Sequence, residues 1–257
     1  APEPLPGSPT ITVGGVQTVL VLGADERFYT HVEMTAELVD DDVDLVVWAE
    51  SSVVFDLEDR PEELAGMASQ SEAVGAPILV NVDARRGEGV NFKSSVLVDS
   101  SGVVARYDKR RLVPFGEYIP ARSLLGWMAE VTDAAEENRR RGESLAVMEL
   151  DPAGTGAGAD GGPGESTEAI GVGPLVCFES AFPDLSRELT RMGADLVVPQ
   201  TATTTFQGSW AQEQHASLAA VRAVEVGRPV VHAAVSGVSA AFDAEGGELA
   251  RMGSDEV

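Results

Sequence analysis

Apolar runs of strand length alternate with segments of helical periodicity in the first third of the chain. Residues 11–22, 43–50 and 76–82 are rich in valine, isoleucine and leucine and predict strands. Residues 25–41 repeat apolar side chains on one helical face. Residues 60–75 have proline near the start and glycine at the end, as helices often do. The pattern therefore predicts strands and helices in alternation.

The rest of the chain continues this alternation after an interruption. Residues 91–109 form two alternating stretches around a Ser-Ser-Gly turn, which predicts a β-hairpin. Residues 112–150 carry no pattern that assigns them, and the glycine-rich stretch 151–167 predicts a surface loop. The pattern then predicts strand 174–178, helix 183–192, strand 195–199, helix 211–227, strand 229–235 and a hairpin around residues 243–248.

These elements indicate an α/β layered domain, and the hairpins indicate that its sheets are mixed. The strands on both sides of the glycine-rich loop are short and would need common sheets, so we expect one domain over residues 11–257. Residues 1–10 read as a proline-rich linker or as the boundary of an excised domain. No apolar run approaches the roughly 20 residues that a transmembrane helix requires.

The chain is strongly acidic, with 18 Lys+Arg against 42 Asp+Glu and a net charge of −24. Such a surface would repel nucleic-acid phosphates, and no basic stripe is visible in the sequence, so we expect no nucleic-acid partner. The single cysteine excludes an internal disulfide and a multi-cysteine zinc site. His31, His215 and His232 lack metal-ligand spacing. We therefore predict no metal site and no cofactor.

Three side chains with complementary chemistry lie at the ends of predicted strands. Glu50, Lys109 and Cys177 each occupy such a position, where α/β folds commonly place catalytic groups. A thiolate can act as a nucleophile, a carboxylate as its general base, and a lysine as a stabiliser of thiolate and oxyanion. Together they would form an acyl-transfer site that needs no histidine.

Taken singly, each of these residues has a simpler interpretation. A lone cysteine in an apolar strand is usually a small core residue. A glutamate after a strand is more often a loop residue or helix cap, and a lysine followed by two arginines is usually surface charge. Only their occurrence within three local motifs favours catalysis.

The motifs are "LVVWAES" (45–51), "YDKRRLVPFGEYIP" (107–120) and "GPLVCFES" (173–180). In this order they resemble the Glu, Lys and Cys motifs of the nitrilase, or carbon–nitrogen hydrolase, superfamily. The resemblance extends over nearly the whole chain. It implies a nitrilase-like αββα sandwich with mixed sheets, in which each of the three residues closes a strand.

The lysine motif discriminates within the superfamily. "KRRLVPFGEYIP" (109–120) closely resembles the apolipoprotein N-acyltransferase family, and residues 209–247 resemble the C-terminal part of its catalytic domain, particularly in actinobacterial members. This implies an enzyme on the extracytoplasmic face of the cell membrane. It would move a fatty acyl chain from a phospholipid donor to the N-terminal amine of a diacylglyceryl apolipoprotein acceptor. The family's flanking transmembrane segments are absent from this chain.

The resemblance also implies roles for the matched residues. Cys177 would be the nucleophile that carries the acyl chain as a thioester, and Glu50 would be the general base and acid. Lys109 and the backbone N–H of Phe178 would form the oxyanion hole. Glu117 would support the triad.

Three further positions complete this comparison. Glu179 is a matched residue that we expect to order the lysine or the nucleophile loop. The family commonly has tyrosine where this chain has Phe178, so the backbone donor is retained and a hydroxyl is lost. The family often has asparagines where this chain reads "TATTTFQG" (201–208).

Apolar residues gather after Lys109. They could line an acyl pocket or meet the edge of the bilayer, with Phe115, Tyr118 and Trp127 as expected substrate contacts. They could equally pack a helix onto the core, and the sequence leaves both open. The residues are Leu112, Val113, Pro114, Phe115, Tyr118, Ile119, Leu124, Leu125, Trp127 and Met128.

Two other functions stay open. The first is a soluble amidase of the same superfamily, which would hydrolyse a small amide with water as the acceptor. The second is a catalytically inactive nitrilase-like domain that serves as an interaction module. The presence of all three triad residues argues against the second, since a scaffold has no need of them.

Overall fold

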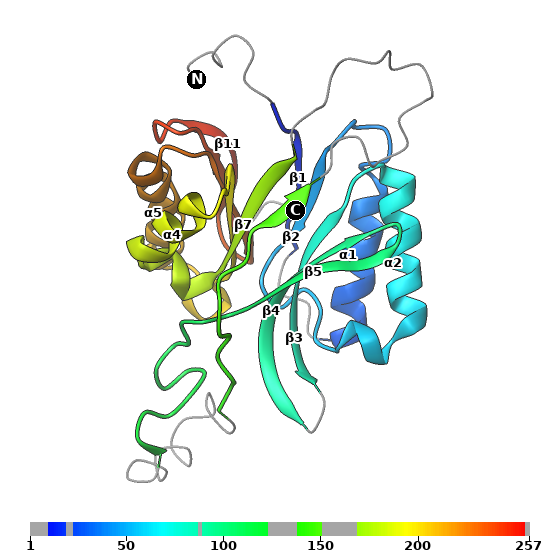
Figure 1. The fold of residues 1–257 in the computed structure, drawn as a ribbon, viewed down its shortest axis with the longest axis horizontal. Helices are drawn as coiled ribbons and strands as arrows, with labels where there is room; N and C mark the ends of the chain where they lie inside the picture. The colour runs from blue at the N-terminus through cyan, green and yellow to red at the C-terminus, as the bar shows by residue number, and fades with distance from the viewer. Residues whose placement is uncertain (1–9, 19–22, 87–88, 123–137, 151–168, 255–257) are drawn as a thin grey trace.

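The computed structural model describes residues 10–18, 23–86, 89–122, 138–150 and 169–254. Two sheets pack face to face in the middle of the molecule, and a pair of helices covers the outer face of each sheet (Figure 1). This is an αββα sandwich, and the predicted fold class is confirmed. The predicted linker at residues 1–10 and the loop at 151–167 fall almost entirely outside the described residues.

The first sheet has five strands in the order β1-β2-β3-β4-β5. Its first three strands run parallel, while β3, β4 and β5 are antiparallel neighbours. The predicted hairpin is therefore present and makes the sheet mixed. The strands are β1 (Val13–Val16), β2 (Leu45–Trp48), β3 (Ile78–Arg86), β4 (Val90–Asp99) and β5 (Gly102–Asp108).

The second sheet has six strands in the order β11-β10-β9-β8-β7-β6. Strands β7, β8 and β9 are parallel, and antiparallel strands flank them on both sides. The short β6, which the sequence left unassigned, pairs with β7. The strands are β6 (Met148–Leu150), β7 (Ile170–Val176), β8 (Leu196–Ala202), β9 (Val230–Val235), β10 (Ser239–Phe242) and β11 (Glu248–Met252).

The helices lie close to the predicted ranges. They are α1 (Ala24–Ala36), α2 (Pro61–Val74), α4 (Pro183–Arg191) and α5 (Trp210–Val226). Only α1 is clearly shorter than predicted, because it ends before the acidic run 40–42. Negative side chains at a helix C-terminus oppose the helix dipole and favour an early end.

Successive side chains along a strand point alternately to the inner and the outer face of its sheet. In β2, Leu45 and Val47 belong to the core between the sheets, and Val46 and Trp48 belong to the core beneath α1 and α2. Because both faces are buried, the strand is a continuous apolar run in the sequence. Gln200 of β8 also joins the two sheets, since its side-chain amide donates to the carbonyl oxygens of Trp48 (2.8 Å) and Leu79 (3.2 Å).

Strand β7 differs from its prediction at both ends. It begins at Ile170, earlier than predicted, and stops at Val176, so Cys177 opens a short 3-10 turn, Cys177–Ala181. No helix within the described ranges is both long and apolar enough to cross a membrane.

Candidate active site

The strand ends bring the three predicted catalytic residues together. Glu50 lies two residues beyond β2, Lys109 directly follows β5, and Cys177 directly follows β7. The thiol of Cys177 is hydrogen-bonded to the Glu50 carboxylate. Lys109 Nζ lies 3.8 Å from Glu50 Oε1. Three segments far apart in sequence thus meet between the two sheets.

The backbone at two positions of this site adopts a left-handed conformation that residues other than glycine rarely adopt. Cys177 has φ +49° and Ser51, next to Glu50, has φ +54°. In a residue other than glycine, such a left-handed conformation destabilises the fold by on the order of 1–3 kcal/mol. It persists only where the surrounding structure holds it in place. Ser51 is held by the Asn81 side chain, which accepts its N–H at 2.9 Å, and by Arg27, which donates to its carbonyl oxygen at 2.8 Å.

A second lysine, which the sequence did not single out, lies even closer to Glu50. Lys93 Nζ on β4 is 2.8 Å from Glu50 Oε1, and its side chain is only 10% exposed. Across the β3–β4 pair it faces Asp83, whose Oδ2 lies 3.5 Å from its Nζ. Lys93 shares a strand face with Leu97 of the core between the sheets. A charged residue at a position that alternation assigns to the core face of the strand could have identified Lys93 in the sequence as a candidate site residue.

Carboxylates and cations alternate in this buried cluster. Burial acts to raise the pKa of Glu50, but the charges of Lys93 and Lys109 outweigh it, and the pKa is lowered. The pKa of Lys93 is raised, because Glu50, Asp83 and Glu117 outweigh the opposing effect of burial. Glu50 is therefore an ionised carboxylate at neutral pH.

The thiol has the opposite tendency. Burial and then the charge of Glu50 raise the pKa of Cys177 to about 12, although Lys109 and Lys93 act to lower it. The resting site therefore holds a neutral thiol beside a carboxylate. Such a pair can transfer the thiol proton as the sulfur attacks, so no standing thiolate is needed.

Glu117 and Glu179 each contact the predicted lysine segment. Glu117 Oε1 accepts from Lys109 Nζ at 2.8 Å, and its Oε2 accepts from the N–H of Val113. Glu179 is fully buried, and its Oε1 accepts from Tyr107 and from two backbone N–H groups of the lysine segment, 2.8 and 2.9 Å away. Its Oε2 accepts from the N–H of Val176. Glu179 thus bonds both to the lysine segment and to the last residue of β7, directly before Cys177.

A pocket of about 570 Å³ opens beside the nucleophile turn. Phe178 and Tyr118 contribute to its wall, together with Phe182, which packs edge-on against Phe178 at 4.9 Å between ring centroids. Phe115 is 41% exposed and does not line this pocket, and Trp127 lies outside the described residues. Of the other apolar residues after Lys109, Pro114 and the mostly buried Leu112 line the pocket, whereas Ile119 is buried.

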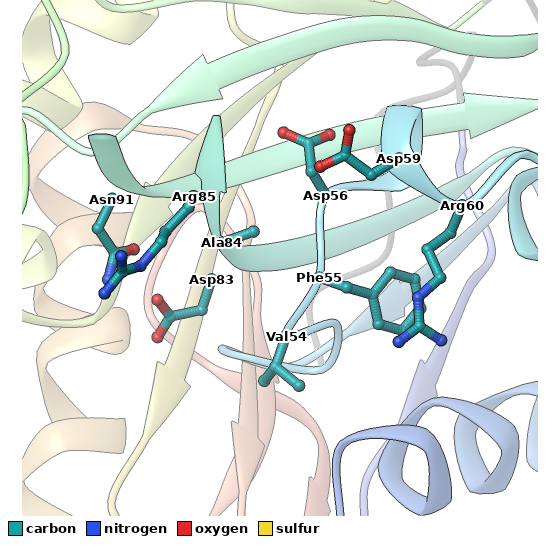
Figure 2. Close-up of a pocket in the computed structure, with 9 residues that line it drawn as sticks. All are labelled: Val54, Phe55, Asp56, Asp59, Arg60, Asp83, Ala84, Arg85 and Asn91. Carbon is teal, nitrogen blue, oxygen red and sulfur yellow. The ribbon is translucent and has the colours of Figure 1, made fainter. Parts of the chain in front are cut away.

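A second pocket, of about 470 Å³, lies on the other side of Asp83. Figure 2 shows the carboxylates of Asp56 and Asp59 together at one end of this space and the side chains of Arg85 and Asn91 at another. Its lining carries both signs of charge. Asp83 belongs both to this wall and to the cluster around Lys93.

Two histidines that seemed isolated in the sequence also meet near the site. His215 Nδ1 lies 3.2 Å from His232 Nε2, and His215 Nε2 lies 3.3 Å from the Ser180 hydroxyl. Burial lowers the pKa of His232 to about 3 and lowers that of His215, so both are neutral at pH 7. In the part of the chain that the structure describes, no group of three or more His, Cys, Asp or Glu side chains is arranged to hold a metal ion.

Comparisons with known proteins identify the family and the fold. The carbon–nitrogen hydrolase family model matches residues 12–256. A protein of Geobacter metallireducens named apolipoprotein N-acyltransferase is 33% identical over 211 residues, covering 79% of this chain and 36% of that protein. One of Rhizobium meliloti with the same name is 32% identical over 262 residues, covering 95% of this chain and 46% of that protein. The chain thus spans less than half the length of these relatives.

Solved structures share the fold at low sequence identity. A carbon–nitrogen hydrolase from Helicobacter pylori G27 superposes with a TM-score of 0.71 at 14% identity, covering 96% of this chain and 86% of that one. An amidase from Nesterenkonia sp. AN1 superposes with a TM-score of 0.69 at 17% identity, covering 96% and 91%. The fold and the match over almost all of its length place the chain in the carbon–nitrogen hydrolase family.

Proposed function

We propose that this chain is the catalytic domain of an apolipoprotein N-acyltransferase. It transfers a fatty acyl chain from a phospholipid, through a thioester on Cys177, to the N-terminal amine of an S-diacylglyceryl-cysteine apolipoprotein. The observation that carries the proposal is the meeting of Cys177, Glu50 and Lys109 at three strand ends beside an apolar-walled pocket.

In the first half-reaction the sulfur of Cys177 attacks the ester carbonyl of the phospholipid. Glu50 takes the thiol proton as the C–S bond forms. The negative charge on the carbonyl oxygen is stabilised by Lys109, which the buried Glu117 holds in place, and by the N–H of Phe178. When the C–O bond breaks, Glu50 returns the proton to the leaving oxygen, and lysophospholipid departs.

In the second half-reaction the amine of the acceptor attacks the thioester. Glu50, again ionised, takes a proton from the amine as the C–N bond forms and delivers it to the departing sulfur of Cys177. The product is an N-acylated lipoprotein, and the free thiol is restored. The same residues thus serve both halves, which is the pattern of a ping-pong enzyme.

Relatives support an acyltransferase over an amidase. The Geobacter and Rhizobium relatives described above, at about one-third identity, are named apolipoprotein N-acyltransferase, whereas the Nesterenkonia amidase is 17% identical. Because the chain covers less than half of those relatives, membrane anchoring through segments outside this chain and an extracytoplasmic active site belong to the proposal.

The full-length protein tests this function. After incubation with phospholipid in detergent micelles, intact-mass analysis is expected to show one added acyl chain. Addition of a synthetic S-diacylglyceryl-cysteine peptide should then transfer the acyl chain from the protein to the amine of the peptide. Release of ammonia from a short aliphatic amide, with no acyl mass gained from phospholipid, would instead identify the soluble-amidase function.

Lys93 gives the acyltransfer reaction a characteristic pH dependence. Replacing Lys93 with glutamine removes a cation that lowers the pKa of Glu50, so that pKa rises. Glu50 must be ionised to act as base. The acidic limb of the pH profile of kcat/KM is therefore expected to move to higher pH, with about a tenfold loss on that limb.

The matched control is Arg86→Gln. This substitution also removes one positive charge. The guanidinium of Arg86 pairs with Asp108 and stacks on Phe92, and does not pair with Glu50. Circular dichroism checks that both variants fold. An acidic limb that stays in place in folded Lys93→Gln would show that Lys93 does not set the charge state of Glu50.

A further inference from the structure

Two basic triplets lie against each other, and three of their arginines line the 570 Å³ pocket beside the nucleophile turn. Residues 109–111 read Lys-Arg-Arg and residues 139–141 read Arg-Arg-Arg, so together they hold six of the chain's 18 Lys+Arg. The N–H of Gly142 donates to the carbonyl oxygen of Lys109 at 2.8 Å, which fixes the two segments side by side. In a chain of net charge −24 this is a local concentration of cationic side chains.

Arg140 and Arg141 differ from the other four members of the triplets, because neither has a carboxylate partner among the described residues, and of these two only Arg141 lines the pocket. Its Nε donates to the carbonyl oxygen of Arg110 at 3.3 Å, and within the described residues no carboxylate lies within ion-pair distance of it. The side chain is exposed and lines the 570 Å³ pocket. Four members of the triplets are paired: Lys109 with Glu117, Arg110 with Glu188, Arg111 with Asp184 and Arg139 with Asp83.

The pocket therefore combines an apolar wall with positive charge. Phe178 and Phe182 form part of the wall, and the Arg111 guanidinium stacks over the Phe182 ring at 4.2 Å while also facing the pocket. Because Phe178 follows Cys177 directly, a group bound here lies next to the nucleophile turn. This lining suits an amphiphilic substrate that carries an anion close to its reacting carbonyl.

We propose that this pocket binds the phosphate group of the phospholipid donor, with Arg141 as its main ligand and Arg111 as a second. The proposal rests on the function proposed above and adds the feature of the donor that is recognised. Guanidinium groups match phosphate oxygens in geometry and charge. In a glycerophospholipid only the glycerol unit separates the phosphate from the ester carbonyls, so one molecule can contact Arg141 and present an ester to Cys177.

Acyl-enzyme formation by the full-length protein tests this site. Two donors are compared, phosphatidylglycerol in mixed micelles and diacylglycerol, which has the same esters and no phosphate. We expect the ratio of kcat/KM for phosphatidylglycerol to that for diacylglycerol to fall about tenfold in Arg141→Ala, through KM, since one charge-assisted hydrogen bond is lost. Arg141→Lys should keep part of the ratio.

Arg140→Ala is the matched control. Arg140 belongs to the same triplet but does not line the pocket, so its loss should leave the ratio as in the wild type. Inorganic phosphate is the second probe. If the site recognises phosphate as such, millimolar phosphate should raise KM for phosphatidylglycerol in the wild type and have less effect in Arg141→Ala. If phosphate has no effect in either protein while the ratio falls in Arg141→Ala, the site requires the lipid-attached phosphate.

The outcomes separate this proposal from the proposed function. If the wild type and Arg141→Ala have the same donor ratio, or if Arg140→Ala lowers it equally, the phosphate site is wrong while the acyltransferase stands. If neither lipid nor the activated ester p-nitrophenyl palmitate acylates Cys177, the proposed function fails and the phosphate site falls with it.

Discussion

Replacing Cys177 with alanine is expected to abolish acyl transfer, with a loss of at least about 10⁴-fold, the scale on which loss of a catalytic nucleophile acts. Cys177 is the only cysteine in the chain, so no other side chain can form a thioester. The side chain is small and partly exposed, and alanine can occupy the same backbone conformation. We therefore expect folding and the melting temperature to stay close to the wild type.

Intact-mass analysis after incubation with phospholipid measures this result. The wild type should gain one acyl chain that neutral hydroxylamine removes, as a thioester requires, and Cys177→Ala should gain none. Cys177→Ser tests the chemistry more finely, because its hydroxyl is a weaker nucleophile in the same place. A hydroxylamine-resistant acyl group on Cys177→Ala would show that the nucleophile lies elsewhere.

Glu50→Gln is expected to change two reactions of the same thiol in opposite directions. Without the carboxylate that accepts the thiol proton, acylation by phospholipid should fall by about 10²–10⁴-fold. The charge of Glu50 also raises the pKa of Cys177, while Lys93 and Lys109 act to lower it. Removing that charge should lower the pKa of the thiol, so alkylation by iodoacetamide at pH 8 should become faster.

The paired measurement separates a lost base from a damaged site. Glu58→Gln is the matched control, since Glu58 carries the same charge on an exposed side chain whose ion-pair partner among the described residues is Arg106, at 3.5 Å. Normal acylation by Glu50→Gln would remove Glu50 from the mechanism. Slower alkylation in a folded variant would mean that the carboxylate activates the thiol in the resting state, contrary to its effect on the thiol pKa.

The sequence was sufficient to predict the order of most strands and helices and to identify candidate residues near the strand ends. Buried parallel strands are continuous apolar runs, so Glu50 and Cys177 could be placed near strand ends without coordinates, although the exact last residues of β2 and β7 differ from the predicted ones. The hairpin before Lys109 was visible as an alternation around a glycine turn. The fold class followed from the order of these elements and from the resemblance to a known superfamily.

Other parts of the site depend on contacts that no local pattern records. Lys93 meets Glu50 only through the register of the β3–β4 pair and the packing of the two sheets. The basic triplets are separated by 27 residues, and the sequence between them predicted no element that would bring them together. The absence of a basic stripe in the sequence was therefore no guide to the charge beside the pocket. The extent of β7, and hence the turn at Cys177, also depends on its pairing with β8.

Glu179 links the position of the Cys177 thiol to that of the lysine segment. One carboxylate accepts the N–H of Val176, just before Cys177, and N–H groups of Arg110 and Arg111, just after Lys109. A local opening that frees one of these segments strips a buried carboxylate of its donors, so it also releases the other. The positions of Cys177 and Lys109, the proposed nucleophile and oxyanion stabiliser, are thus acquired and lost together. A partly unfolded chain then exposes an ordinary thiol that has lost both the carboxylate and the lysine proposed to assist it.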